Sequence, residues 1–503
     1  MNITKILSKL FAHRITAARR WAENREGVQR AELARMIKTA ARTEWGTSHG
    51  YADIRCYEDY RERVPVTPYE TLRPMVMRMI KGERNLLWPG RTMRFAQSSG
   101  TSDGKSKYIP ITDESLHRSH YRGGGDVVAH YLHQHPDSRL FSGKSFILGG
   151  SFANELNLPA HSKVKVGDLS ANLIDHINPL VELLRVPRRD IALMSDWSRK
   201  LPALAEAAMR QNVTNISGVP SWFLTVLREI LERSGAKHLH EVWPNLEVFF
   251  HGGISFAPYH AQYDGIIDPT RMCYMETYNA SEGFFALQDN PESHAMLLLM
   301  DAGTFFEFIP ADSPSALPIP AWEVEQGKIY ALVITSCNGL WRYPLGDTVL
   351  VESTSPLRIT IAGRTKHFIN AFGEEVMVYN TDAALAKTCD ALHCEVLNYT
   401  AAPVYTTGKS HGRHEWLIEF STIPEDMDEF AMVLDRYLQQ ENSDYQAKRS
   451  GDIFLDRLSV VKAAPGLFDR WLASTGKLGG QRKVPRLCND RHLMDRMLEM
   501  NNQ

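Results

Sequence analysis

Ten consecutive residues, Ser98–Lys107, have side chains and backbone suited to binding phosphate. They read SSGTSDGKSK and combine hydroxyl groups, glycines and lysines. Hydroxyl and free N–H groups donate hydrogen bonds to phosphate oxygens, glycine lets the backbone approach them, and lysine supplies positive charge. A flexible polar hairpin is the alternative, because Ser, Gly and Asp also favour turns.

This loop departs from the P-loop of nucleoside triphosphatases. That motif needs four residues between its glycines and a helix that begins at its lysine. Here only three residues, Thr-Ser-Asp, separate Gly100 from Gly104. The residues that follow, Lys107-Tyr-Ile-Pro-Ile, alternate in polarity like a strand. Pro110 would also interrupt a helix. The sequence therefore predicts strand, loop and strand over residues 93–111, followed by a helix capped by Thr112.

Two further segments carry polar groups next to predicted strands. Tyr278-Asn-Ala-Ser-Glu282 offers a ring that could stack on adenine and a carboxylate that could bind Mg²⁺, which prefers oxygen ligands. Asp347 precedes a predicted strand at 348–352 and could accept hydrogen bonds from both ribose hydroxyls. For each segment alone, a turn or surface carboxylate is the alternative.

The late segment GKLGGQRKVPR, residues 476–486, combines glycines with basic side chains. It could form a mobile cationic finger that ends in Lys483, and a solvated basic turn is the alternative. Residues 361–375, which include Arg364 and the pair Glu374-Glu375, could form a hinge or a simple turn between domains.

The elements that must position these segments predict an α/β fold. Between residues 198 and 276, helices alternate with short apolar strands near 213–217, 246–250 and 271–276, which indicates a mainly parallel sheet. Ligands bind at the carboxyl ends of such strands. Residues 284–362 predict an antiparallel β subdomain, and residues beyond about 372 predict a compact α+β domain. In the helix after Thr112, Gly123-Gly124-Gly125 indicates a break or a close-packing site.

Composition excludes several classes of protein. The 503 residues exceed one hydrophobic core, so we expect two domains. Basic residues number 57 and acidic residues 59, so no charge pattern for nucleic acid is present. The six cysteines lack zinc-site spacing and fit reduced thiols in a cytoplasmic protein. No apolar run is long enough to span a bilayer, so we expect no integral membrane association. The sequence does not specify the oligomeric state.

The motifs and their order resemble those of adenylate-forming enzymes, which include acyl-CoA synthetases, luciferases and nonribosomal peptide adenylation domains. Within that superfamily, the details resemble the auxin-responsive Gretchen Hagen family of acyl-acid amido synthetases, in a bacterial-type form. The resemblance extends from residue 43 to residue 487 and rests on these segments: TEWGTSHGY, SSGTSDGKSKYIPIT, ISGVPSW, HGG, YNASEG, LGD and GGQRKVPRL.

The resemblance implies a large adenylation domain, residues 1–368, and a smaller mobile C-terminal domain, residues 369–503. It implies that Lys483 is catalytic and that Glu282 is catalytic and binds Mg²⁺. It also implies an ATP site formed by Ser98, Ser99, Thr101, Thr277, Tyr278, Asn279, Asp347 and Arg364. Where many plant members have an acidic residue followed by Lys in the hinge segment, this chain has Glu374-Glu375, so a phosphate contact there is not implied.

The activity implied is an ATP-dependent ligase that converts a carboxylic acid to an acyl-adenylate and then forms an amide with an amine, expected to be an amino acid. We expect the acid to bind among Tyr121, Val219, Trp222, Gly252 and Gly253, although such apolar residues are also typical of a core. A thiol acceptor, as in an acyl-CoA ligase, and an inactive nucleotide-binding homologue are the alternatives. Whether Lys477 or Lys105 shares the role of Lys483 stays open.

Overall fold

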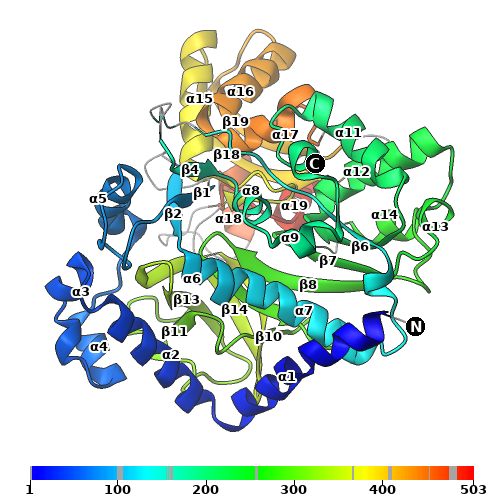
Figure 1. Ribbon diagram of the computed structural model, residues 1–503. Coiled ribbons are helices and arrows are strands. Elements are labelled where there is room, and N and C mark those ends of the chain that lie inside the picture. Colours follow the sequence, from blue (N-terminus) through cyan, green and yellow to red (C-terminus); the bar gives the residue numbers. More distant parts are fainter. Residues whose placement is uncertain are drawn as a thin grey trace. The chain divides into compact units, whose positions relative to one another are not determined.

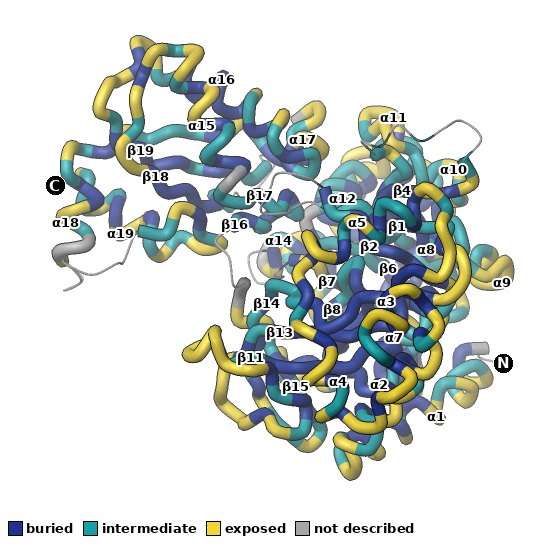
Figure 2. Tube along the Cα trace, turned by 90° about the vertical axis from the view of Figure 1, so that its left-hand side faces the viewer, coloured by how far each residue is buried: buried dark blue, intermediate teal, exposed yellow. Residues whose placement is uncertain are grey.

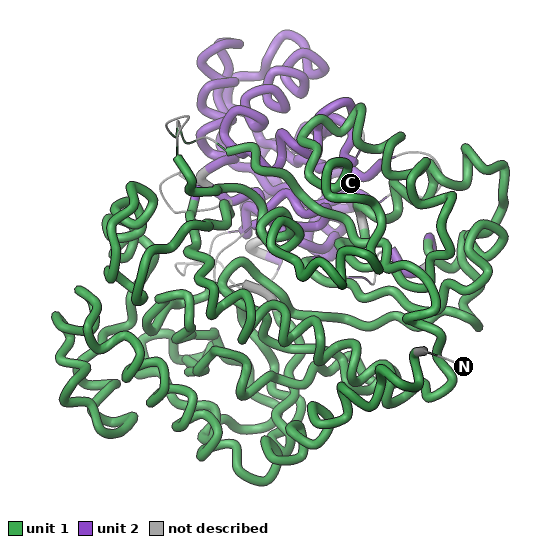
Figure 3. The backbone as a smooth tube through the Cα atoms, viewed as in Figure 1, with its two compact units in different colours: residues 1–98, 107–253, 263–365 green, residues 99–106, 254–262, 366–503 purple. Residues whose placement is uncertain are grey.

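The computed structural model describes residues 3–98, 106–154, 156, 158, 162–254, 256, 259–364, 368–405, 411–452, 454–474 and 484–502. The chain divides into two compact units, which Figure 3 colours separately. Unit 1 contains residues 1–98, 107–253 and 263–365, and unit 2 contains residues 99–106, 254–262 and 366–503.

Unit 1 is built on a 12-stranded mixed sheet, and its strands lie in the order β12-β11-β13-β14-β15-β10-β9-β8-β7-β6-β3-β5 (Figure 1). The strands are β3 (Lys144–Ile147), β5 (Arg185–Val186), β6 (Val213–Gly218), β7 (Val248–Gly252), β8 (Cys273–Ala280), β9 (Gly283–Gln288), β10 (Met296–Leu298), β11 (Thr304–Pro310), β12 (Ile319–Pro320), β13 (Ile329–Ser336), β14 (Leu340–Thr354) and β15 (Leu357–Arg364). Figure 2 shows how thoroughly the strands at its centre are buried.

The predicted parallel α/β region is confirmed. Strands β5, β3, β6, β7 and β8 pair in parallel, and α12 (Pro220–Ser234) connects β6 to β7. The predicted antiparallel strands are present, although they do not form a sheet of their own. Strand β8 continues to Ala280 and pairs with β9 in an antiparallel hairpin, so the antiparallel strands extend the same sheet. A hairpin needs only a tight turn, whereas each parallel pair needs a crossover.

Helices pack around this sheet. Unit 1 also contains a small, separate three-stranded sheet, which is described below. The long helices are α1 (Ile3–Glu23), α2 (Arg25–Ala40), α5 (Tyr69–Ile80), α7 (Tyr121–Gln134) and α11 (Trp197–Met209). The shorter ones are α3 (Glu44–Ser48), α4 (Tyr57–Arg63), α6 (Asp113–Ser115), the π-helix η2 (Leu116–His120), α8 (Leu169–Asp175), α9 (Pro179–Glu182), α10 (Arg189–Ala192) and α13 (Leu239–Val242). Helix α14 (His260–Asp264) spans the boundary between the units.

The three glycines after Thr112 lie inside α7 and do not break it. A Cβ added at Gly123 would lie 2.3 Å from the ring of Phe284, so the helix needs glycine there to pack against the sheet. Of the two interpretations of this segment, close packing is the one that the structure supports. The Thr112 side chain accepts a hydrogen bond from the Ser115 N–H at 2.9 Å, which confirms the predicted cap.

The two strands predicted at the ends of residues 93–111 are confirmed. Strand β1 (Arg94–Ser98) pairs antiparallel with β2 (Lys107–Ile111), and its other neighbour is β4 (Lys165–Gly167). Ser98 lies opposite Lys107 in this pairing. Residues 99–105, between these two strands, are outside the described residues.

Unit 2 has the predicted α+β composition. Its sheet consists of β18 (Glu395–Val404), β19 (Arg413–Thr422) and β20 (Ser459–Lys462), and a short hairpin joins β16 (Phe368–Ile369) to β17 (Val376–Met377). Its helices are α15 (Val378–Leu392), α16 (Met427–Glu441), α17 (Ser443–Arg449), α18 (Leu467–Ser474) and α19 (His492–Asn501).

Glu374 has a structural place in this unit. Its carboxylate accepts hydrogen bonds from the N–H groups of Ala371 and Phe372 and lies 2.8 Å from Nε2 of His414. The side chains of Glu374 and His414 are both fully buried. This carboxylate therefore fixes the turn at residues 370–374, which agrees with leaving it out of the phosphate site.

Candidate functional site

Several of the predicted site residues lie where β8 passes the end of its parallel neighbour. Thr277 of β8 is paired with Gly252, the last residue of β7. Tyr278 and Asn279 therefore extend beyond the carboxyl end of β7, and Glu282 lies in the turn that leads to β9. This is the edge at which parallel sheets bind ligands.

Tyr278 and Asp347 are in direct contact although 69 positions separate them. The Tyr278 hydroxyl donates a hydrogen bond to Oδ2 of Asp347, and both residues are buried. The Tyr278 ring also meets Phe285 edge-on, with 5.2 Å between ring centroids. The contact joins the residue expected beside adenine to the residue expected beside ribose.

A lysine, a tyrosine and a carboxylate form a chain beside this pair. Nζ of Lys107 donates to the Tyr343 hydroxyl at 2.9 Å, and that hydroxyl lies 3.5 Å from Oε1 of Glu282. The main chain of Glu282 is fixed as well, because Asn338 donates to its carbonyl oxygen at 3.0 Å. Glu282 is only 9% exposed. We call Lys107, Tyr278, Glu282, Tyr343 and Asp347 the carboxyl-edge site.

Asn279 is held by a buried histidine. Nδ1 of His120, the last residue of the π-helix η2, lies 3.3 Å from Oδ1 of Asn279. Burial lowers the pKa of His120 to about 4, against the smaller opposing effect of the Asn279 hydrogen bond. The imidazole is therefore neutral near pH 7, and its Nδ1 can donate to the amide oxygen. Among the described residues, Nε2 of His120 has no hydrogen-bond partner.

At the end of β7, positions 252 and 253 require glycine, one for lack of space and the other for its backbone conformation. A Cβ on Gly252 would lie 2.3 Å from the carbonyl oxygen of Thr277, and Gly253 has a φ of +85°. A Cβ on Gly253 would lie 3.4 Å from Cγ2 of Val219, so two of the expected acid-binding residues are neighbours. The Thr277 hydroxyl donates to the His251 carbonyl at 3.0 Å. Thr277 therefore helps to hold the end of β7.

Two other expected acid-binding residues have contacts typical of a core. The Tyr121 hydroxyl donates to the Leu173 carbonyl at 2.9 Å, and burial raises the pKa of Tyr121 to about 12. The Trp222 ring meets Trp197 edge-on, with 5.6 Å between centroids. Their place in an acid pocket stays a prediction.

The remaining predicted residues are only partly described. Ser98 ends β1, and Arg364 ends β15 opposite Asp347 in the β14–β15 pairing. Ser99, Thr101 and Lys483 lie outside the described residues, as do Lys105 and Lys477.

Sequence reasoning missed Tyr343, His120 and Asn338. Tyr343 belongs to the segment WRYPLGD, in which only Asp347 was assigned a role, so an aromatic hydroxyl four residues before the aspartate was the available signal. Lys107 was given no individual role, and its contact with Tyr343 connects it to Glu282. Nothing in the sequence connects His120 to Asn279, because 159 positions separate them.

The site can be tested for its fit to Mg²⁺. In the described part of the chain, no group of three or more His, Cys, Asp or Glu residues could hold a metal ion. Mg²⁺ needs no such cage, since it is usually bound by one or two carboxylates together with substrate phosphates and water. Glu282, a buried carboxylate whose Oε1 is 3.5 Å from the nearest tyrosine hydroxyl, fits that donor set.

Among the described helices, none is long and apolar enough to cross a membrane.

Known proteins resemble this chain in both sequence and fold. Three family models match: the GH3 family N-terminal domain over residues 14–272, the central domain over 297–364 and the C-terminal domain over 379–492. Similar curated proteins include indole-3-acetic acid-amido synthetase GH3.3 of Arabidopsis thaliana, 22% identical over 94% of this chain and 91% of that protein. Indole-3-acetic acid-amido synthetase GH3.8 of Oryza sativa subsp. indica is 24% identical over 65% of this chain and 64% of that protein.

Solved structures agree on the fold. The AtGH3.15 acyl acid amido synthetase in complex with 2,4-DB has a TM-score of 0.62 and 18% identity, covering 97% of this chain and 95% of that one. A 2-hydroxyisobutyryl-CoA ligase in its thioesterification state has a TM-score of 0.57 and 13% identity, covering 95% and 92%. The expected architecture, a large α/β domain followed by a smaller α+β domain, is thus confirmed. The chain belongs to the GH3 family, the family that its motifs resemble.

Proposed function

We propose that this protein is an ATP-dependent, AMP-forming ligase that activates a carboxylic acid as an acyl-adenylate and transfers the acyl group to an amine, an amino acid in the first instance. Family membership and the carboxyl-edge site support the proposal together. The single observation that carries it is the contact between Tyr278 and Asp347, because it brings together two separate motifs, one expected beside adenine and one expected beside ribose.

The chemistry explains why ATP is needed. A carboxylate is a poor acylating agent, since its leaving group would be an oxide. Attack of the carboxylate oxygen on the α-phosphorus of ATP forms the acyl–O–P bond and releases pyrophosphate. The amine then attacks the acyl carbon, and AMP leaves with the bonding electron pair. Phosphoryl transfer of this kind depends mainly on positioning and on neutralising charge.

Each residue of the site has a proposed task in that reaction. Ser98, Ser99 and Thr101 donate to the ATP phosphates. Tyr278 packs on adenine, with Thr277 and Asn279 at its edge. Asp347 accepts from the ribose hydroxyls, and Arg364 lies beside it.

Charge neutralisation is assigned to a metal ion and a lysine. Glu282 holds Mg²⁺, which when bound offsets the negative charge of the phosphates. Lys483 approaches the phosphates from the C-terminal domain. Lys107, through Tyr343, orients the Glu282 carboxylate toward the metal.

The two half-reactions need different surroundings, so we propose that the small domain moves between them. Residues 1–368 would bind ATP and the acid, and residues 369–503 would deliver Lys483 for adenylation and then rotate away. A cytoplasmic location fits the dispersed cysteines and the use of ATP.

The experiment that tests the proposal is ATP–pyrophosphate exchange with a panel of carboxylic acids, followed by mass spectrometry of products formed with pooled amino acids or with CoA. We expect acid-dependent exchange and an amide product of the acid with an amino acid. A thioester formed only with CoA would make the protein an acyl-CoA ligase. No exchange with any acid would favour an inactive nucleotide-binding homologue.

A further inference from the structure

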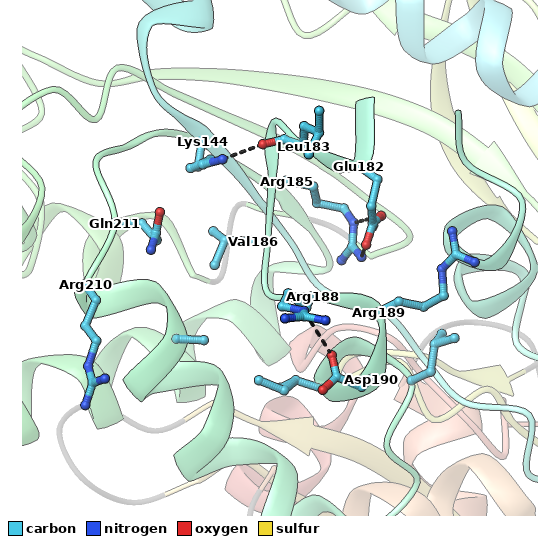
Figure 4. Close-up of a pocket in the computed structure, with 13 residues that line it drawn as sticks. Lys144, Glu182, Leu183, Arg185, Val186, Arg188, Arg189, Asp190, Arg210 and Gln211 are labelled. Atoms are coloured by element: carbon cyan, nitrogen blue, oxygen red, sulfur yellow. Dashed lines mark hydrogen bonds and ion pairs between the residues drawn. The ribbon is translucent and has the colours of Figure 1, made fainter. Parts of the chain in front are cut away.

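A cavity of about 1060 Å³ lies at the far side of the parallel strands from the carboxyl-edge site. Lys144 is the first residue of β3, Arg185 is the first residue of β5, and Gln211 lies just before β6. These three residues therefore mark the amino ends of parallel strands, whereas Tyr278 and Glu282 lie beyond the carboxyl end of β7. We call this cavity the amino-edge pocket (Figure 4).

The lining of the amino-edge pocket is strongly basic. Its basic side chains are Lys144, Arg185, Arg188, Arg189 and Arg210, and its acidic side chains are Glu182 and Asp190. Figure 4 shows the basic side chains arranged around the cavity from several elements: β3, β5, α10 and the end of α11. A concave surface with this excess of positive charge attracts anions.

The cations at the rim are only weakly neutralised by the protein. Arg188 is 3.9 Å from Asp190, and their side chains are 89% and 71% exposed. Arg210 pairs with Glu206 at 2.6 Å, again with both side chains largely exposed. Ion pairs exposed in this way contribute little free energy, so both guanidinium groups can bind another anion at small cost.

The wall of the pocket contains a buried donor without an acceptor. The Arg185 side chain is 0% exposed and forms a two-pronged ion pair with Glu182 through Nε and Nη2, at 3.0 Å and 2.7 Å. Its third nitrogen, Nη1, is buried and has no hydrogen-bond partner among the described residues. Burying a donor that has no acceptor costs desolvation free energy. A ligand that supplied an acceptor would remove this cost.

The pocket also has an apolar part, formed by Leu183, Val186, Ile191, Leu193 and Ala207. Its volume is at the upper end of the range for small-molecule sites. An anion with an apolar body would therefore use both kinds of lining. Several cations with planar guanidinium groups favour a doubly charged phosphate over a singly charged carboxylate, because arginine binds phosphate through paired hydrogen bonds.

We propose that the amino-edge pocket is a binding site for a small organic phosphate, with the phosphate held by Arg185, Arg188 and Arg210 and the apolar group against Leu183 and Val186. This site is separate from the one at which ATP and the acid are proposed to react. It does not depend on the proposed function, because the cavity and its charges are independent of the carboxyl-edge site.

Isothermal titration calorimetry on the full 503-residue chain tests this proposal, with hexyl phosphate, inorganic phosphate and hexanoate as probes. We expect saturable binding of hexyl phosphate, weaker binding of inorganic phosphate, and weaker binding at higher ionic strength because the rim is exposed. In the double variant Arg188→Ala/Arg210→Ala, we expect the Kd for hexyl phosphate to rise by about tenfold or more.

The matched control is Arg19→Ala/Arg233→Ala. It also removes two exposed arginines, and Arg233 pairs with Glu229 on its helix as Arg210 does with Glu206. We expect this control to bind hexyl phosphate like the unaltered protein. The proposal is overturned if the rim variant binds as tightly as the unaltered chain, or if no saturable binding occurs. Hexanoate binding that is as tight as that of hexyl phosphate, and that is weakened equally in the rim variant, would show that the assigned ligand class is wrong.

Discussion

At the carboxyl edge of the parallel strands, Glu282 and Asp347 are buried and lie against tyrosine hydroxyls, whereas at the amino edge Arg188 and Arg210 are exposed. Of the five residues of the carboxyl-edge site, two are acidic and Lys107 is basic. The amino-edge pocket has an excess of basic side chains. A site for ATP that is itself rich in carboxylates must receive its positive charge from elsewhere. That requirement explains why the proposed reaction uses Mg²⁺ and a lysine from the C-terminal domain.

The largest effect is expected from Glu282→Gln. This change keeps the size of the side chain and removes the charge that would hold Mg²⁺. We expect acid-dependent ATP–pyrophosphate exchange to fall by about 10²–10³-fold, the typical loss when one charge-stabilising group is removed from a transition state. Glu323→Gln, at an exposed position of unit 1, is the control and should exchange normally. Equal exchange in both variants would exclude Glu282 from the reaction.

Lys483→Ala should have an effect of similar or slightly smaller size. If positive charge reaches the phosphates from the C-terminal domain, removing this lysine should lower exchange by about 10²-fold and leave the thermal unfolding temperature unchanged. Lys477→Ala removes a lysine from the same segment and should change exchange little. A larger loss in Lys477→Ala than in Lys483→Ala would transfer the proposed role to Lys477.

Tyr343→Phe should have a moderate effect. It removes the hydroxyl between Lys107 and Glu282, so we expect exchange to fall by about tenfold, as for the loss of a hydrogen bond to charged groups. Tyr330→Phe is the matched control, because the Tyr330 hydroxyl accepts a hydrogen bond from the Glu325 N–H away from this site. It should lose stability and keep its exchange rate. A Tyr343→Phe protein that exchanges as well as Tyr330→Phe would show that the chain of contacts has no part in catalysis.

The last prediction concerns pH and stability, and we expect no effect on exchange near pH 7. Burial lowers the pKa of His120 from 6.5 to about 4, so between these values the unfolded chain binds a proton that the folded chain does not. His120 should therefore make the protein less stable as the pH falls from 6.5 toward 4, by up to about 3 kcal/mol. Urea unfolding across this range should show a shallower pH dependence for His120→Asn than for the unaltered chain. His133→Asn, an exposed position of α7, should leave the dependence as it is, and a parallel curve for His120→Asn would contradict the account.

The sequence was informative where a motif adjoins a strand. The spacing of Gly100 and Gly104, which departs from a P-loop, and the alternation after Lys107 correctly predicted a strand on each side of this segment, because these are local properties of the chain. The helix cap at Thr112 and the parallel strands β6–β8 were predicted from local sequence in the same way.

Contacts across long separations could not be predicted in this way. The pairing of Tyr278 with Asp347, and of His120 with Asn279, depends on how β8, β14 and η2 come together in the fold. The single sheet was also missed, since a change from parallel to antiparallel strands looks the same in sequence whether or not the sheet is continuous. The amino-edge pocket is lined by residues between 144 and 211 from five elements, β3, α9, β5, α10 and α11, and these residues form no motif.

The most direct test of the account compares acid-dependent ATP–pyrophosphate exchange in three proteins: the unaltered chain, Glu282→Gln, and Arg188→Ala/Arg210→Ala. We predict exchange in the first, a loss of about 10²–10³-fold in the second, and no change in the third, because adenylation is proposed to take place at the carboxyl edge alone. Normal exchange in Glu282→Gln together with a loss in the arginine variant would contradict the central claim and place the chemistry at the amino edge.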